Sequence, residues 1–496
     1  MKTFNFKFSA DLEKIANNSL KYDAAIIGSG IAAYILCRKL HKDKKILVLE
    51  QGSYKSKEFE NSDLINHGNF KLKQNTINRT IGGTSTLWSG NICEYESIEF
   101  KTKEGKFWQI KNEIQNHYLE ARRLLGLILR KNYNNIEVDN FFKKRRILTQ
   151  FIPTRVRQKL TKLRIHLLYN AKVILIGENK HPYVIIGNKK LYFKKIILAN
   201  GCLESIKLID NSVKKTSLIL NMDTSFIGSG YMNHPKIRIN KFVIPKKNNK
   251  IFNIYENRKF HFNGIALNNL QQYKNRLNNT YFRLHPRFFA ENKIEFKILN
   301  FLFSNKKIIL QNIFKLNFDP IFSKKLKKYF KFNLFLKFFN FRFYYYILFF
   351  CGLVRLKVKY FDIEYFMEMK SRNKNKIYFQ NDIINTNINL ISKDFETLEY
   401  LHEKLVFYLD NDNKINPRYK KVNFKNLKFE DAAHHIGGLV MNNFTKNGFV
   451  NQNLQIRNTK NIFVCSSSLF PSSGSCNPSL TIASMCIKLS NFILNN

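Results

Sequence analysis

The segment from Tyr22 to Glu50 constrains the fold more than any other part of the chain. An apolar run (Tyr22-Asp-Ala-Ala-Ile-Ile) leads into a glycine turn, and a helical pattern follows from Ile31 to Leu40. A second strand pattern then covers residues 45–50, with the apolar residues Ile46-Leu-Val-Leu at its centre. Two buried strands joined by a helix within about thirty residues form a β-α-β unit, which requires a parallel sheet. We therefore predict an α/β chain whose parallel sheet begins close to the N-terminus.

The glycine turn carries a binding pattern as well as a fold signal. Gly28, Gly30 and Ala33 form a G-x-G-x-x-A string between a strand and a helix, the context in which such a string binds a dinucleotide. Gly28 permits a tight turn, Gly30 lets the backbone approach a pyrophosphate, and Ala33 allows close helix packing. Glu50 ends the second strand about twenty residues later, where a carboxylate can bind ribose hydroxyls. The alternative is a chance glycine turn.

The chain is strongly basic, with a formal net charge of +47 over 496 residues. Such a charge first suggests nucleic acid or an anionic membrane as a partner. The lysines are spread along the whole chain, however, and no nucleic-acid-binding module accompanies them. The charge is therefore better explained by the amino-acid bias of an AT-rich genome acting on surface positions.

Several sequence features bear on the compartment. The seven cysteines form no C-x-x-C pair, so we expect neither a disulfide framework nor a metal site, and a reducing compartment. The first twenty residues contain no apolar run typical of a signal peptide. The apolar run Phe343–Val354 is too short to span a bilayer comfortably. The segment 323–359 around it mixes Lys with Phe, Leu and Tyr, as either a cover over a core or a surface that rests on a membrane.

Four blocks of sequence follow one another along the chain. They are residues 22–50, residues 79–90 with Gly82-Gly83-Thr84 and Trp88, residues 196–204 with 228–235, and residues 433–438 continued through 461–481. In this order they resemble the glucose–methanol–choline (GMC) family of FAD-dependent oxidoreductases, and the nearest likeness is to the branch of gluconate and fructose dehydrogenase flavoprotein subunits. The blocks cover roughly half of the chain, and residues 236–420 match only faintly.

The resemblance implies a Rossmann-like FAD-binding domain assembled from both chain ends, with a substrate-binding domain inserted between them. The expected class is α/β (α+β overall), with residues 1–235 and 425–496 in the FAD domain and residues 236–424 in the inserted domain. Residues 79–90 contain no His of the kind that binds FAD covalently in several relatives, so we expect non-covalent FAD. The expected cofactor-binding residues are Gly28, Gly30, Ala33, Glu50, Gly82, Gly83, Thr84, Trp88, Val173, Ala199, Gly201, Ser467 and Pro478.

The catalytic residues that the resemblance implies lie in the last block. Oxidation of an alcohol by flavin transfers a hydride to the flavin N5 and needs a base for the hydroxyl proton. His434 matches the family base, and Asn477 matches the group that binds the substrate oxygen. His435 is the rival for the role of base, because a one-residue change of alignment exchanges the two. His234, which precedes Pro235, is expected to be a structural loop histidine.

The leading hypothesis is therefore an FAD-dependent oxidoreductase acting on the CH–OH group of a sugar or other alcohol. The alternatives are a flavin-bearing lyase or isomerase, a flavin subunit that passes electrons to a membrane partner, and a basic protein that binds nucleic acid or membrane. We expect a small-molecule alcohol or sugar substrate, an electron acceptor as partner, and no specific nucleic acid. The expected location is cytoplasmic, with peripheral contact through 323–359 at the inner face of the membrane as the alternative.

Overall fold

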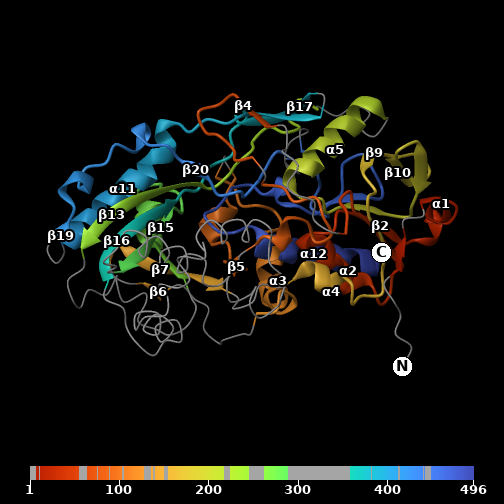
Figure 1. Ribbon diagram of the computed structural model, residues 1–496, viewed down its shortest axis with the longest axis horizontal. Coiled ribbons are helices and arrows are strands. Elements are labelled where there is room, and N and C mark those ends of the chain that lie inside the picture. Colours follow the sequence, from red (N-terminus) through yellow and green to blue (C-terminus); the bar gives the residue numbers. More distant parts are fainter. Residues whose placement is uncertain are drawn as a thin grey trace, which may run out of the picture.

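The computed structural model shows two large β-sheets, each covered by helices and placed side by side (Figure 1). Residues 323–357, which hold the Phe343–Val354 run, lie outside the part that the structure describes. The described residues are 7–9, 12–54, 64–74, 76–88, 90–102, 105–127, 136–137, 140–149, 155–216, 224–244, 262–288, 358–380, 382–410, 414–439, 441 and 448–496.

The first sheet is parallel and has the strand order β1-β8-β3-β2-β12-β21. Its strands β2, β3, β12 and β21 are buried along their whole length, as expected for a parallel sheet covered on both faces. The predicted β-α-β unit at residues 22–50 is therefore confirmed. The strands are β1 (Lys7–Ser9), β2 (Ala24–Ile27), β3 (Ile46–Leu49), β8 (His166–Leu168), β12 (Ile196–Leu198) and β21 (Ile462–Val464).

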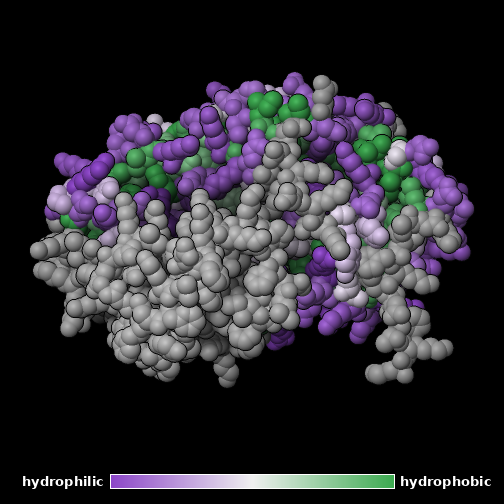
Figure 2. Space-filling view, viewed as in Figure 1, coloured by the Kyte–Doolittle hydropathy of each residue, from purple (hydrophilic) through white to green (hydrophobic). Residues whose placement is uncertain are grey.

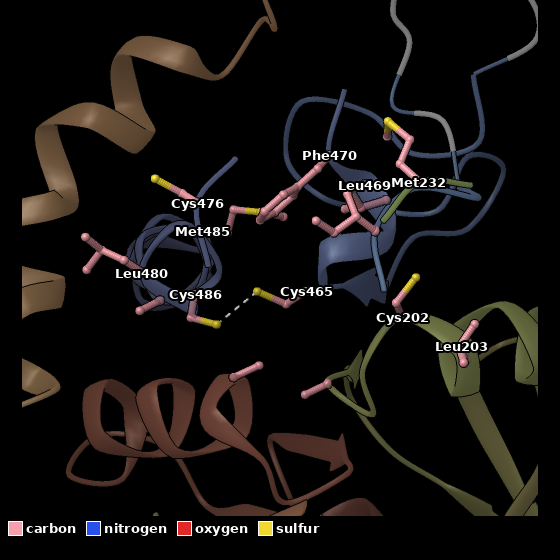
Figure 3. Close-up of a cluster of buried hydrophobic side chains, with 14 of the residues drawn as sticks. Cys202, Leu203, Met232, Cys465, Leu469, Phe470, Cys476, Leu480, Met485 and Cys486 are labelled. Carbon is pink, nitrogen blue, oxygen red and sulfur yellow. Dashed lines mark hydrogen bonds between the residues drawn. The ribbon is translucent and has the colours of Figure 1, made fainter. Parts of the chain in front are cut away.

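Helices from both chain ends pack together beside this sheet. The C-terminal helix α12 (Ser479–Asn495) packs against α2 (Ile31–Leu40) and α3 (Lys111–Leu124). Figure 3 shows the interior of this region, where Cys486 of α12 faces Cys465 with the two sulfur atoms 3.1 Å apart. The last helix thus completes the unit that the N-terminus begins. The other helices of this part are α1 (Leu12–Ala16), α4 (Val156–Leu160) and α5 (Cys202–Lys215).

Two smaller sheets flank the first one. An antiparallel sheet of β9 (Val173–Glu178), β10 (Pro182–Ile186) and β11 (Lys189–Tyr192) packs against α5. A second small sheet joins β4 (Leu64–Asn66) to the hairpin β17 (Lys376–Gln380) and β18 (Ile383–Asn387). Short 3-10 helices occupy the connections, at η1 (Ser19–Lys21), η2 (Gly83–Thr86), η3 (Ser97–Phe100), η7 (Pro417–Tyr419), η8 (Phe424–Asn426) and η9 (Ser467–Leu469).

The second large sheet is antiparallel and has the order β19-β13-β16-β15-β14-β7-β5, with β20 on β13 and β6 on β7. Figure 1 shows α11 (Ser392–Asp410) over this sheet, at the opposite end of the molecule from α5. The strands are β5 (Asn91–Ile92), β6 (Ile136–Glu137), β7 (Phe142–Thr149), β13 (Pro235–Ile244), β14 (Phe262–Leu267), β15 (Tyr281–Phe288), β16 (Val358–Phe366), β19 (Lys414–Ile415) and β20 (Glu430–Asp431). The short helix α6 (Asn269–Lys274) follows β14.

The strands β5, β6 and β7 belong to the second sheet, although the predicted boundaries placed residues 1–235 in the FAD domain. They lie within residues 1–235, yet they pair with the second sheet. The reason is long-range pairing, since Phe142–Ile147 align with Phe262–Leu267 more than one hundred residues later. The second sheet is thus built from three separate parts of the chain.

The surface of the described residues is largely hydrophilic. Figure 2 shows purple hydrophilic residues over much of the described part of one face, with separate green patches between them. No helix within the described ranges is long and apolar enough to cross a membrane. The six cysteines that the structure describes are buried free thiols.

Candidate active site

A cavity of about 840 Å³ lies where the strands of the parallel sheet end. Ligands of open α/β sheets bind at the carboxyl ends of the strands, because the connecting loops leave a crevice there. Its wall includes the residues that directly follow four strands, namely Gly28, Ser29 and Gly30 after β2, Glu50 after β3, Ala199, Asn200 and Gly201 after β12, and Cys465 and Ser466 after β21.

The glycine turn at the start of α2 is shaped to hold a phosphate group. Gly28 has a φ of +94°, and a Cβ there would lie 2.7 Å from the Cα of Asn200. A Cβ on Gly30 would have no atom within 4 Å, so that position opens into the cavity. The helix begins at Gly30 without a side-chain cap. Its first backbone N–H groups and its positive end therefore suit a pyrophosphate.

Glu50 is buried in the cavity wall and held in place by two hydrogen bonds. Ser29 Oγ donates to Glu50 Oε2 over 2.6 Å, and the Gly52 N–H donates to Oε1 over 2.7 Å. Burial raises the pKa of this carboxyl group, although both hydrogen bonds oppose the rise. The carboxylate keeps lone pairs for further donors. Its place after β3 is the position from which an acid binds ribose hydroxyls.

The loop at residues 80–90 closes one side of the cavity. Gly83, Thr84 and Trp88 line it, and a Cβ on Gly83 would lie 3.5 Å from the Cα of Gly30. Gly82 does not line the cavity, and its N–H donates instead to Ser29 Oγ over 2.9 Å. This bond fixes the loop against the glycine turn.

Most of the predicted cofactor residues lie in the cavity wall. Ala33, Gly82 and Ser467 are the exceptions. Ala33 is fully buried within α2, where it allows the close packing that its small size predicted. Ser467 Oγ donates to the carbonyl of His435 over 2.7 Å, so it supports the histidine loop rather than the cavity. The predicted residues in the wall are Gly28, Gly30, Glu50, Gly83, Thr84, Trp88, Val173, Ala199, Gly201 and Pro478.

His434 and Asn477 meet at the wall of the same cavity. His434 Nε2 lies 3.1 Å from Asn477 Nδ2, although the two residues are 43 positions apart. Burial lowers the pKa of His434 well below 6.5, and the nearby His234, His435, Arg283 and Lys236 add to the effect. The imidazole is therefore neutral near pH 7 and can accept a proton.

His435, the rival base, lies outside the cavity wall. Its Nδ1 is 2.6 Å from the Tyr231 hydroxyl, and its Nε2 is 2.9 Å from Thr76 Oγ1. Both ring nitrogens are thus already engaged by hydroxyl groups. This geometry favours His434 as the residue that meets a substrate.

His234 lies behind His434 on the side away from Asn477. The Nδ1 atoms of the two histidines are 2.7 Å apart, and the ring centroids are 4.9 Å apart at an angle of 85°. His234 Nε2 is 2.8 Å from the carbonyl oxygen of Ser473, and the side chain is fully buried. The sequence indicated a structural loop residue here, and it gave no sign that these histidines meet.

The segment that carries Asn477 is fixed by a buried polar cluster from the second sheet. Arg145 of β7 lies 2.5 Å from both Ser475 Oγ and Glu99 Oε2. Glu99 Oε1 accepts from the Ser475 N–H over 2.7 Å. The cluster thus links the second sheet to the loop before α12.

The wall also contains residues that sequence reasoning did not select. Arg79 and Glu204 form an ion pair of 2.7 Å beside the cavity. Asn200 and Ser466 directly follow β12 and β21. Their position after buried strands of a parallel sheet is the signal that could have identified them.

Residues 370–485 match the family model described as GMC oxidoreductase. The matched part begins shortly after β16 and ends within α12, so it includes both His434 and Asn477. The C-terminal part of the chain is thus a GMC oxidoreductase domain. No protein in a comparison with curated sequences matches the chain.

The fold is similar to many solved structures. One is pyridoxine 4-oxidase from Mesorbium loti, with a TM-score of 0.56 and 11% sequence identity over 96% of this chain and 99% of that chain. At this identity the similarity shows the fold alone. It confirms the predicted mixed α/β architecture.

Proposed function

We propose that this protein is an FAD-dependent oxidoreductase that removes a hydride from a carbon bearing a hydroxyl group. The observation that carries the proposal is the contact of His434 with Asn477 in the wall of a cavity that is also lined by a dinucleotide fingerprint. The family match of residues 370–485 supports the same class of chemistry.

The cavity suits FAD in shape and in chemistry. Its volume of about 840 Å³ lies within the usual range of ligand sites. Gly28 and Gly30 leave room for a pyrophosphate at the helix start, and Glu50 accepts hydrogen bonds where a ribose would lie. Residues 79–90 contain no His, so we propose that the FAD is held without a covalent bond.

A bound flavin supplies the acceptor for the substrate hydride. The protein then has two tasks at the substrate oxygen. Neutral His434 takes the hydroxyl proton on Nε2, and the Asn477 amide donates a hydrogen bond to the oxygen as negative charge develops on it. The fixed 3.1 Å contact places the base and the donor on the same small region, where one oxygen can reach both.

The substrate that we propose is a sugar or another alcohol. The resemblance to gluconate and fructose dehydrogenase subunits favours a polyol or sugar within this class. The second sheet lies next to the histidine loop, because His234 directly before β13 contacts His434, and Lys236 of β13 pairs with Glu430 of β20.

The proposal is tested by the visible spectrum of the purified protein under anaerobic conditions. We expect a flavin spectrum that bleaches when one member of a panel of sugars and polyols is added. In His434→Ala the flavin should stay bound, and bleaching should slow by about two to four orders of magnitude. A bound flavin that no alcohol reduces would favour the lyase or isomerase alternative. A folded protein that takes up no FAD would refute the proposal.

A further inference from the structure

We propose that His234 is a positioning residue that fixes the ring tautomer of His434, so that the lone pair of His434 lies on Nε2, where the Asn477 amide donates to it. The role of that lone pair in catalysis rests on the proposed function. The tautomer itself is a property of the folded protein and needs no substrate.

The carbonyl oxygen of Ser473 determines which ring nitrogen of His234 carries a hydrogen. His234 Nε2 lies 2.8 Å from the Ser473 carbonyl oxygen, which can only accept a hydrogen bond. His234 Nε2 therefore carries a hydrogen and donates it. The ring is fully buried, and burial lowers the pKa of His234 to about 4, so the ring is neutral at pH 7. A neutral imidazole has one N–H, which leaves Nδ1 of His234 as an acceptor.

The protonation of His234 in turn determines the tautomer of His434. Its Nδ1 lies 2.7 Å from Nδ1 of His234, a distance at which one of the two nitrogens must donate. Since His234 Nδ1 has no hydrogen, the donor is His434 Nδ1–H. The second nitrogen of a neutral His434 ring, Nε2, is therefore unprotonated.

The contact of His434 with Asn477 independently indicates the same tautomer. Asn477 Nδ2 lies 3.1 Å from His434 Nε2, and an amide nitrogen can only donate. The other tautomer of His434 would turn two lone pairs toward each other at 2.7 Å on the His234 side. It would also place two donors in contact on the Asn477 side. Both contacts therefore select the same tautomer.

Further contacts hold the Ser473 carbonyl and His234 in place. The Ser473 carbonyl also accepts a hydrogen bond from the Tyr95 hydroxyl, and Tyr95 is buried. His234 precedes Pro235, whose strand β13 pairs with Asp431 of β20 just before the histidine loop. The acceptor for His434 thus stays in place while the substrate changes.

Two variants at position 234 test this role, and a third at position 434 assigns the signals. His234→Leu removes the acceptor for His434 Nδ1–H and keeps an apolar side chain in the buried site. His234→Asn keeps a short side chain whose oxygen can accept that hydrogen bond. His434→Asn identifies the ring signals of His434 among the eleven histidines of the chain.

The first measurement is ¹⁵N NMR of the histidine rings in the purified flavin-loaded protein without substrate. We expect His434 to show a protonated Nδ1 and an unprotonated Nε2 in the wild type and in His234→Asn. In His234→Leu we expect a shift toward the Nε2–H form. A protonated Nε2 on neutral His434 in the wild type would overturn the inference, and so would an unchanged tautomer in His234→Leu.

The second measurement is the rate of flavin reduction by an active alcohol. We expect His234→Leu to slow reduction by at least tenfold with little change in KM, and His234→Asn to restore most of the rate. Equal loss in both variants would contradict the positioning role. If the NMR pattern is as expected while no alcohol reduces the flavin, the tautomer assignment stands and the proposed function fails.

Discussion

The Arg145 guanidinium donates to the Glu99 carboxylate over 2.5 Å, and both side chains are completely buried. The pair joins β7 of the second sheet to η3, which lies between β5 and α3 in the chain. Both residues also bind Ser475, two positions before Asn477. A charged pair therefore lies at the junction on which the geometry of the active site depends.

Loss of Arg145 should destabilise the protein strongly. Arg145→Ala leaves the Glu99 carboxylate buried without its counter-ion, which typically costs about 3–5 kcal/mol. The free energy of unfolding in urea measures this cost. The control is Lys39→Ala, which breaks the partly exposed Lys39–Glu120 pair and should cost less than about 1 kcal/mol. Similar losses in both variants would show that the buried pair has no special weight.

The two adjacent histidines should differ in their effect on catalysis. His434→Ala removes the base and should slow flavin reduction by about two to four orders of magnitude. His435→Ala removes contacts to Tyr231 and Thr76 from a ring that does not itself line the cavity, so it should lower stability more than the rate of reduction. Stopped-flow reduction and thermal unfolding of both variants measure the difference. A larger kinetic loss in His435→Ala would reverse the assignment.

The rate should remain insensitive to mild acid. The base must be neutral to accept a proton, and burial holds the pKa of His434 well below 6.5 in the folded protein. The value of kcat/KM should therefore stay level as the pH falls through 6.5 and decline only at lower pH, as His434 becomes protonated. The profile is measured with the active alcohol. A decline centred at 6.5 or above would show that another group limits the rate.

Stability should fall in acid, in part because of His234. Its pKa is about 4 in the folded protein and about 6.5 in an unfolded chain, so the unfolded state binds the extra proton between these values. The contribution is fully present above pH 6.5 and is lost as the pH falls from 6.5 toward 4. In His234→Asn the Tm should decline less steeply over this window. Parallel curves for the two proteins would contradict the assignment.

The local parts of this fold could be predicted from sequence. Residues 22–50 carry strand, turn and helix signals within a short window, so β2, α2 and β3 needed no distant information. His434 and Asn477 were selected by motif, and the structure brings them together. In these cases the chemistry of a short segment is sufficient.

The contacts between distant segments could not be predicted in this way. His234 and His434 are 200 positions apart, and neither segment carries a pattern that names the other. The strand β7 joins the second sheet by pairing with β14, which lies more than one hundred residues further along the chain. No local pattern in β7 indicates this partner. Arg145 resembles any other cation of a basic chain until its burial beside Glu99 is known. Tertiary pairing decides these features.

The glycine turn offers the sharpest test of the cofactor site. Gly28→Ala places a Cβ 2.7 Å from the Cα of Asn200, in a backbone conformation that disfavours any side chain. The turn and the strand end beside it must then separate, which displaces the start of α2 from the pyrophosphate position. We expect a folded but less stable protein that takes up FAD much more weakly.

The matched control is Gly187→Ala, where φ is +59° and a Cβ meets nothing within 4 Å. It should carry only the backbone strain, about 1 kcal/mol, and bind FAD normally. Titration with FAD followed by fluorescence measures both variants, and equal binding by the two would show that the turn does not hold the cofactor.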